Sequence, residues 1–231
     1  MNDTPLWIPS PERVAGTQVM DFMRQVNARH GLNLKNYKEL HAWSIAHPDL
    51  FWDQVWDYCG VIGEKGARKL IDGDRMPGAT FFPNAQINFA ENLLRKSGSG
   101  DALVFRGEDK VSYRWSWDDL HAFVSRAQHA LAAAGVGKGD RVAAMLPNLP
   151  ESVGLMLAVT SLGAIWSSCS PDFGERGVID RFGQIEPKLF FAVDGYWYNG
   201  KAIDLTERLS AIARQLPTAQ EVVIVPYLQT A

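Results

Sequence analysis

The sequence has little cysteine, no excess of charge and no long apolar run. The two cysteines, Cys59 and Cys169, lie far apart and form no C-x-x-C pair, a usage that favours a reduced compartment, the cytoplasm. A net charge of -3 over 231 residues gives no reason to expect a nucleic acid or an anionic membrane as partner. The most apolar stretch, 153–166, is too short and too polar to cross a bilayer, and no secretory pattern begins the chain. We therefore expect small-molecule partners.

Motifs for metal binding and nucleophilic catalysis are also missing. The five histidines form neither an H-E-x-x-H nor an H-x-H pattern, so the sequence predicts no metal site. Cys169 lies in SSCSPDFG, at 167–174, where a nucleophile elbow would instead read G-x-S-x-G and need a base. We interpret this segment as a strand end, a turn and a helix start capped by Asp172. No catalytic residue is expected in this chain.

The glycine-rich stretch AGVGKGDRV, at 134–142, does not have the order of elements of a phosphate loop. A Walker loop runs from a strand into a helix, whereas here a helical pattern precedes the loop and the strand pattern RVAAML follows it. We interpret Gly135 as the residue that ends the helix and 137–140 as the turn into the strand. The dinucleotide-binding pattern G-x-G-x-x-G is also missing after RVAAML, where the chain reads PNLPESVG.

The chain contains two regions of different character, separated by the polar break RKSGSGD at 95–101. We place the domain boundary between residues 95 and 96. Upstream, apolar spacing and capping residues predict one helix over 10–31, a second from Asn36 and a third after Pro48. The region 1–95 is therefore expected to be a helical segment, and 96–231 an α/β portion.

Downstream of the break, strand and helix patterns alternate. ALVF and KVSYRW flank the turn RGED as a predicted hairpin, and Ser116 is expected to cap the next helix. Strand-helix units then start at RVAAML, AIWSSC and KLFFAVD, with Asn148 and Asp172 opening the first two helices, and EVVIV ends the series. Continuously apolar strands separated by helices predict an α/β fold with an incomplete doubly wound, mostly parallel sheet.

Ligands of such sheets bind beyond the carboxyl ends of the strands, which here are followed by 147–148, 168–172 and 194–201. The last segment, DGYWYNGK, offers three aromatic rings, an Asn-Gly turn and a lysine. Rings can stack on a purine and a lysine can contact a phosphate, but Asn-Gly between extended residues is also an ordinary hairpin signal. The residues alone favour the hairpin and leave a nucleotide-shaped ligand as the alternative.

Several segments together resemble the acetoacetyl-CoA synthetase branch of the adenylate-forming acyl-CoA synthetases: LFWDQVWDYCGV, FFPNAQINFAENLL, LGAIWSSCSPDFG and YNGK. KGDRV recurs across all adenylate-forming enzymes, whereas the combination of FPNAQINFAENLL with SCSPDFG and YNGK looks specific for the acetoacetyl branch. Acetyl-CoA and propionyl-CoA synthetases are the nearest alternatives. A non-catalytic nucleotide-binding module is a further one.

The resemblance implies a two-step ligase that uses ATP, CoA and Mg²⁺. The carboxylate of acetoacetate attacks the α-phosphate of ATP to give an acyl adenylate and diphosphate, and CoA then displaces AMP. In the similar acetyl-CoA synthetases, the segment matching Tyr198, Asn199, Gly200 and Lys201 reads Arg-Gly-Gly-Arg and contacts the nucleotide end of CoA, which implies a CoA-binding role for these four residues. Only Lys201 keeps the positive charge, and lysine is a point charge where arginine is a two-pronged donor.

Other motifs of this family have no match in the 231 residues: the phosphate loop with its lysine, the adenine and acid-binding motifs, and the carboxyl-terminal domain. The resemblance therefore implies that the chain is the amino-terminal portion of a larger enzyme. By itself it is expected to hold no tightly bound cofactor and to catalyse neither half-reaction. An incomplete sheet exposes an apolar edge, so we also expect self-association.

Overall fold

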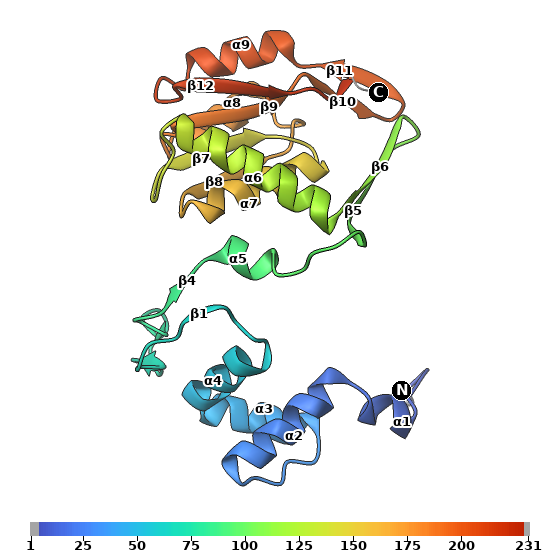
Figure 1. Cartoon of the computed structure of the whole chain (residues 1–231), viewed down its shortest axis with the longest axis vertical. Helices are drawn as coiled ribbons and strands as arrows, with labels where there is room; N and C mark the ends of the chain where they lie inside the picture. The colour runs from blue at the N-terminus through green and yellow to red at the C-terminus, as the bar shows by residue number, and fades with distance from the viewer. Residues whose placement is uncertain (1–4, 229–231) are drawn as a thin grey trace. The chain divides into compact units, whose positions relative to one another are not determined.

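The chain forms two compact units, Met1–Ile87 and Asn88–Ala231, and the computed structural model describes residues 5–228 of them (Figure 1). This division does not test the domain boundary expected between residues 95 and 96, which stays a prediction. Among the described residues, no helix is long and apolar enough to cross a membrane.

The amino-terminal unit is mainly helical. Its core is formed by Phe22, Met23, Val26, Leu40 and Trp43. Its helices are α1 (Pro11–Ala15), α2 (Gln18–His30), α3 (Tyr37–Ala46) and α4 (Pro48–Tyr58). Four two-residue strands follow, β1 (Gly63–Glu64) paired with β4 (Gln86–Ile87) and β2 (Leu70–Ile71) paired with β3 (Thr80–Phe81).

The prediction of one helix over 10–31 is wrong, because that segment contains two helices. Gly16 ends α1, and the hydroxyl of Thr17 accepts a hydrogen bond from the Met20 amide to start α2. Threonine is a common N-cap residue, so Thr17 is the signal for a new helix start within an apolar pattern that otherwise continues. The helix expected from Asn36 is confirmed, since the Asn36 side chain accepts from the Glu39 amide at 3.1 Å.

A charge network ties α2 and the segment after β1 to α4. Asp53 contacts Arg29 at 2.7 Å, Lys65 at 2.8 Å and Lys69 at 3.0 Å, and Asp57 contacts Arg29 at 2.7 Å and Lys65 at 2.5 Å. Burial opposes the ionisation of Asp53, but hydrogen bonds from Lys65 and Lys69 prevail and lower its pKa. Hydrogen bonds from Lys65 and Arg29 lower the pKa of Asp57. Both carboxylates are therefore ionised and stabilising at neutral pH.

We expect Asp53→Ala to lower the unfolding free energy of the amino-terminal unit by about 2 kcal/mol at pH 7, because it removes the carboxylate that Arg29, Lys65 and Lys69 share and leaves the partly buried Lys65 and Lys69 with fewer acidic partners. Folded pKa values below the unfolded ones mean that the unfolded state binds more protons, so the wild-type contribution is present above about pH 4 and is lost as the pH falls below it. Urea unfolding at pH 7 and at pH 3 measures both effects.

Asp74→Ala is the matched control, because Asp74 is exposed and its substitution removes the same charge. Its unfolding free energy should stay within about 0.5 kcal/mol of wild type. Equal effects of the two substitutions would show that net charge, and not the network, stabilises the unit.

The carboxyl-terminal unit is an α/β structure with two hairpins. Its helices are α5 (Phe89–Leu93), α6 (Trp117–Ala133), α7 (Pro150–Ser161), α8 (Glu175–Phe182) and α9 (Thr206–Arg214). Its strands are β5 (Asp101–Gly107), β6 (Val111–Ser116), β7 (Arg141–Met145), β8 (Ile165–Cys169), β9 (Leu189–Val193), β10 (Gly195–Tyr198), β11 (Lys201–Asp204) and β12 (Glu221–Val225).

Four parallel strands form the central sheet in the order β12-β9-β7-β8. β9 lies in the interior, and all five of its residues are buried because helices cover both faces of the sheet. β5 pairs antiparallel with β6, and β10 with β11. The predicted α/β fold with a mostly parallel sheet is confirmed, as is the hairpin around RGED.

Helices cover both faces of this sheet. Val222 of β12 lines a hollow with α9, whereas Val223 and Val225 line one with α6 and α7. Successive side chains of a strand point to opposite faces, so α9 and the α6-α7 pair lie on opposite sides of β12 (Figure 1). The sheet is doubly wound, as predicted.

The stretch AGVGKGDRV is the expected turn between a helix and a strand. α6 ends at Ala133, Gly135 has a φ of 77°, and the Asp140 carboxylate accepts the Gly137 amide at 2.9 Å. Lys188 contacts the same carboxylate at 3.0 Å. The Asp140 carboxylate therefore forms its contacts with the turn backbone and with Lys188, which supports a structural role for this turn.

Two expected helix caps are wrong. The helix expected to open at Asn148 starts at Pro150 with Leu149 before it, since proline fixes the backbone angle of a first helical turn. The helix expected to open at Asp172 starts after Gly174, and the Asp172 carboxylate accepts instead from the Ser170 hydroxyl at 3.0 Å. Both side chains are thus free of a capping role.

Candidate ligand-binding site

The three segments predicted to follow strand ends lie around one cavity of about 410 Å³ in the carboxyl-terminal unit. It opens beyond the carboxyl ends of β7 and β8, and β10 forms its other wall. Its walls combine carboxylate, amide, hydroxyl and aromatic groups. The lining residues include Asn148, Ser168, Cys169, Asp172, Tyr196 and Tyr198. The rule that parallel sheets bind ligands at this edge therefore predicts the position of the cavity.

The segment DGYWYNGK forms the hairpin β10-β11, as the residues alone favoured. Tyr198 pairs with Lys201, so Asn199 and Gly200 are a two-residue turn with φ values of 50° and 73°. Positive φ at both positions is what Asn-Gly turns provide. Tyr198 is 62% exposed, and Lys201 is exposed beside it. The ring of Tyr198 therefore lines the cavity, and the exposed Lys201 lies opposite Tyr198 in the hairpin.

Cys169 has no features of a nucleophile. Burial raises the pKa of its thiol to about 11, so the sulfur is protonated at neutral pH. No histidine lines the cavity to act as its base. The hydroxyls of the same wall are held locally, as when Ser170 donates to Asp172. This arrangement suits binding rather than covalent catalysis.

The floor of the cavity carries one negative charge. Burial and the neighbouring Asp172 carboxylate raise the pKa of Tyr196, which therefore stays a neutral phenol. Arg208 supports the same wall from below by donating to the carbonyl of Pro171 at 3.3 Å. An anionic ligand group would therefore lie at the Lys201 end of the site, away from Asp172.

Glu108 is a site-adjacent residue that the sequence did not predict. Its two carboxylate oxygens accept the amides of Asn199 at 2.7 Å and Gly200 at 2.8 Å. It lies in the turn of the β5-β6 hairpin, 91 residues before Asn199. The carboxylate in RGED is the only local signal, and nothing in its spacing reveals a partner so far along the chain.

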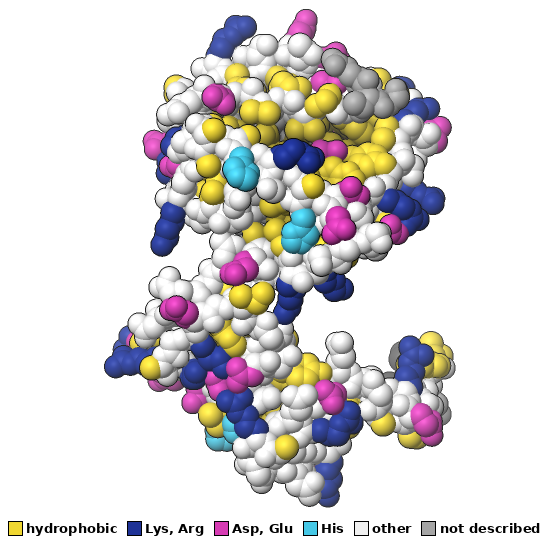
Figure 2. All heavy atoms as spheres, viewed as in Figure 1, with side chains coloured by type: hydrophobic (Ala, Val, Ile, Leu, Met, Phe, Trp, Pro, Cys, Tyr) yellow, Lys and Arg dark blue, Asp and Glu magenta, His cyan; other side chains and the backbone are white. Residues whose placement is uncertain are grey.

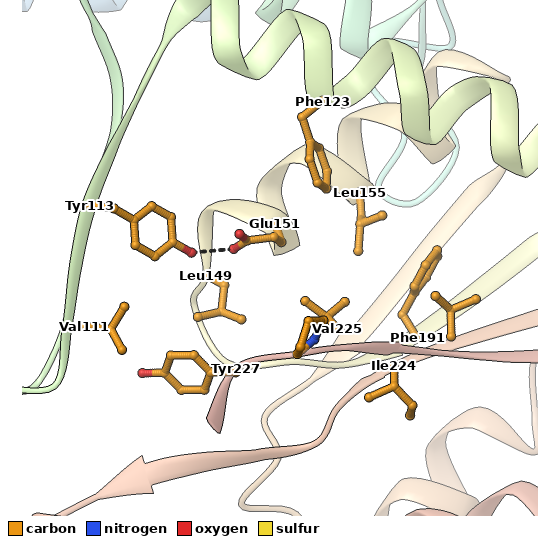
Figure 3. Close-up of a pocket in the computed structure, with 12 residues that line it drawn as sticks. Val111, Tyr113, Phe123, Leu149, Glu151, Leu155, Phe191, Ile224, Val225 and Tyr227 are labelled. Atoms are coloured by element: carbon orange, nitrogen blue, oxygen red, sulfur yellow. Dashed lines mark hydrogen bonds between the residues drawn. The ribbon is translucent and has the colours of Figure 1, made fainter. Parts of the chain in front are cut away.

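A second cavity, of about 510 Å³, is mainly apolar (Figure 3). Side chains of β6, α6, α7, β9 and β12 line it, and its polar contact is the Tyr113 hydroxyl donating to Glu151 at 2.6 Å. Burial, then this hydrogen bond, raises the pKa of Tyr113. Figure 2 shows apolar side chains around hollows in the surface of the carboxyl-terminal unit. Among the described residues, no lysine or arginine lines either cavity. The first is the better candidate for a phosphorylated ligand, because its lining is more polar and its Tyr198 pairs with the exposed Lys201.

No group of three His, Cys, Asp or Glu side chains within residues 5–228 could hold a metal ion. We therefore derive no step through a metal from these residues.

The chain belongs to the AMP-binding enzyme family, which residues 91–230 match. Residues 37–93 match the acetyl-coenzyme A synthetase N-terminus. These two matches divide the chain near α5. They define the class of protein as an AMP-binding enzyme with the N-terminal segment of the acetyl-coenzyme A synthetases.

Among individual proteins, the chain is similar to acetoacetyl-CoA synthetases. It is 58% identical over 227 residues to the acetoacetyl-coenzyme A synthetase of Rhizobium meliloti (strain 1021), a match that covers 97% of this chain and 34% of that protein. The structure of the acetoacetyl-CoA synthetase from Streptomyces lividans superimposes with a TM-score of 0.92 at 39% identity, covering 99% of this chain and 36% of that one. The malonamoyl-CoA synthetase of Penicillium aethiopicum is 36% identical, covering 95% of this chain and 31% of that protein.

These comparisons confirm the resemblance drawn from the sequence motifs. The chain spans about a third of the length of the curated relatives it matches. The sheet of the carboxyl-terminal unit is correspondingly an incomplete portion of the adenylate-forming fold.

Proposed function

We propose that the intact protein carrying this chain is an ATP-dependent acetoacetate-CoA ligase. It would convert acetoacetate, ATP and CoA to acetoacetyl-CoA, AMP and diphosphate through an acyl adenylate. The observation that carries the proposal is the 58% identity to an acetoacetyl-coenzyme A synthetase over nearly the whole chain. Cytoplasmic location and a role in lipid metabolism are parts of the same proposal.

The test is product formation by the intact protein with Mg²⁺. Acetoacetate, ATP and CoA should give acetoacetyl-CoA and AMP in equal amounts, and omission of CoA should stop thioester formation without stopping exchange of diphosphate into ATP. Saturable NADH binding without thioester formation would instead favour the non-catalytic nucleotide-binding module. An acetyl-CoA or propionyl-CoA synthetase would use the corresponding acid best.

The 231 residues by themselves are proposed to catalyse neither half-reaction. Reaction at the α-phosphate of ATP depends on positioned cations and amides around it. Neither a phosphate loop in the sequence nor a metal-ligand cluster in the described residues supplies them. Acetoacetate-dependent diphosphate release by the purified chain would refute this part.

For CoA, we propose that Tyr198, Asn199, Gly200 and Lys201 contact its nucleotide end. Tyr198 lines the polar cavity, and Lys201 pairs with it on the neighbouring strand. A phenol ring can stack on adenine, and an ammonium group can pair with a phosphate. These contacts concern the second half-reaction, in which CoA displaces AMP.

We expect Lys201→Glu to weaken CoA binding about tenfold, because it replaces an attractive charge by a repulsive one at an exposed site. Adenylation should be unchanged. The KM for CoA in thioester formation, compared with the rate of exchange of diphosphate into ATP, measures the two steps separately.

Lys138→Glu is the control, because Lys138 is an exposed lysine of the same unit in the turn that the structure assigns to folding. It should leave both rates at wild-type values. A parallel fall of both rates in Lys201→Glu would show a structural role for Lys201 and remove the CoA assignment.

Self-association of the isolated chain is proposed from β12. It is an edge of the described sheet, and Val222 and Ile224 are 38% and 45% exposed on it. Unpaired apolar edges pair with other chains. Sedimentation velocity should show a mass that rises with concentration, and a monomer at all concentrations would exclude this proposal.

A further inference from the structure

Two hairpins that are far apart in the sequence meet beside the candidate site. The turn of β5-β6 supplies Glu108, whose carboxylate oxygens accept the amides of Asn199 and Gly200 at 2.7 and 2.8 Å. Both hairpins belong to the carboxyl-terminal unit. Because each oxygen accepts a hydrogen bond from one amide, the Glu108 carboxylate binds the turn backbone in a bidentate manner.

The turn needs such a partner. In a two-residue hairpin turn, the ladder of β10 and β11 uses the groups of Tyr198 and Lys201, and the amides of the two turn residues point away from it. An ionised acceptor forms stronger hydrogen bonds than a neutral one. Glu108 therefore satisfies two donors that the hairpin cannot satisfy itself.

The backbone of Glu108 supports the same interpretation. Its φ is 51°, a left-handed value that is unfavourable for a residue with a side chain. Residues keep such conformations where their surroundings hold them. Next to it, the ammonium of Lys110 lies 5.7 Å from the ring centre of Trp197 in β10. The tip of β5-β6 thus contacts both the strand and the turn that precede Lys201.

We propose that Glu108 is the positioning residue of the candidate CoA site, and that its carboxylate holds the Asn199-Gly200 turn so that Lys201 is presented to a ligand phosphate. The proposal rests on the proposed function for the identity of the ligand. It also assigns the anion contact to one group. Because Glu108 occupies both turn amides, the phosphate is bound by the Lys201 side chain and not by the turn backbone.

Hydrogen exchange of the ¹⁵N-labelled chain tests the clamp directly. In Glu108→Ala, the amides of Asn199 and Gly200 should exchange about tenfold faster than in wild type, since each loses a charged acceptor. Glu108→Gln keeps a single acceptor oxygen, so it should protect one of the two amides and release the other. Unchanged exchange in Glu108→Ala would overturn the proposal.

Asp109→Ala is the matched control. Asp109 is the neighbouring carboxylate of the same turn, its side chain is 77% exposed, and its recorded ion pair is with Lys110. This variant loses the same charge but keeps the clamp, so its turn amides should exchange within about twofold of wild type.

The ligand side is tested by titrating CoA into the intact protein carrying the same substitutions. Glu108→Ala should raise the Kd for CoA about fivefold through loss of preorganisation, although it removes a negative charge near an anionic ligand. Asp109→Ala should not raise it. If Glu108→Ala and Asp109→Ala unfold at similar temperatures, the weaker CoA binding of Glu108→Ala is due to lost positioning and not to a general loss of stability.

The outcomes are distinct. Tighter CoA binding in Glu108→Ala would show that the carboxylate only repels the ligand, and would overturn its positioning role. Failure of the intact wild-type protein to bind CoA would contradict the CoA assignment and the ligand part of this proposal, while the exchange data would still decide whether Glu108 holds the turn.

Discussion

Replacing Phe190 by alanine is expected to lower the unfolding free energy of the carboxyl-terminal unit by about 4 kcal/mol. Phe190 lies in the interior strand β9 with 0% exposure. It is paired with Val222 on one side and Ala143 on the other, and its ring lies 5.8 Å from that of Phe182 in α8. Truncation leaves a cavity at the centre of a sheet whose strands cannot close around it.

Denaturant unfolding measures this effect, with hydrogen exchange of the β7 and β9 amides reporting the unit that opens. The denaturant concentration at the unfolding midpoint should fall, and the dependence of the unfolding free energy on denaturant concentration should stay constant. Val104→Ala is the control, because Val104 of β5 is 54% exposed, and it should cost no more than about 0.5 kcal/mol. A loss below about 1 kcal/mol for Phe190→Ala would show that β9 is not the centre of the core.

Gly195→Ala should cost about 3 kcal/mol, because the added methyl group has no room. A Cβ there would collide with the carbonyl oxygen of Ile203 and with the side chain of Leu228. Ile203 belongs to the strand paired with β10. The backbone oxygen cannot move away without opening the hairpin that carries Lys201, so CoA binding should weaken together with stability.

Gly100→Ala is the control for this substitution, since a Cβ at Gly100 would meet no atom within 4 Å. Its stability should stay within about 0.5 kcal/mol of wild type. A Gly195→Ala variant as stable as Gly100→Ala, with a protected β10-β11 ladder, would contradict the described hairpin.

Local pattern was sufficient for most of the α/β portion. Alternation and the turn RGED predicted β5-β6, Ser116 predicted the start of α6, and Asn-Gly predicted the turn of β10-β11. The rule that ligands of parallel sheets bind beyond the carboxyl ends of the strands also predicted the position of the polar cavity. These features depend on residues that are close in the sequence, and they could therefore be predicted from local patterns.

Features that depend on distant partners were not predictable in the same way. Glu108 reaches a turn 91 residues away, and Glu151, in the first turn of α7, accepts the hydroxyl of Tyr113, 38 residues before it. The break between α1 and α2 at Gly16 was hidden because the apolar spacing continues through it. The choice of acid has no local signal either, and it comes from family likeness alone.

The measurement that tests the central claim most directly is the kcat/KM of the intact protein for acetoacetate, acetate and propionate in CoA-dependent AMP formation. The proposed function predicts that acetoacetate exceeds each of the other acids by about tenfold or more. A preference for acetate or propionate, or AMP formation that no acid stimulates, would contradict it.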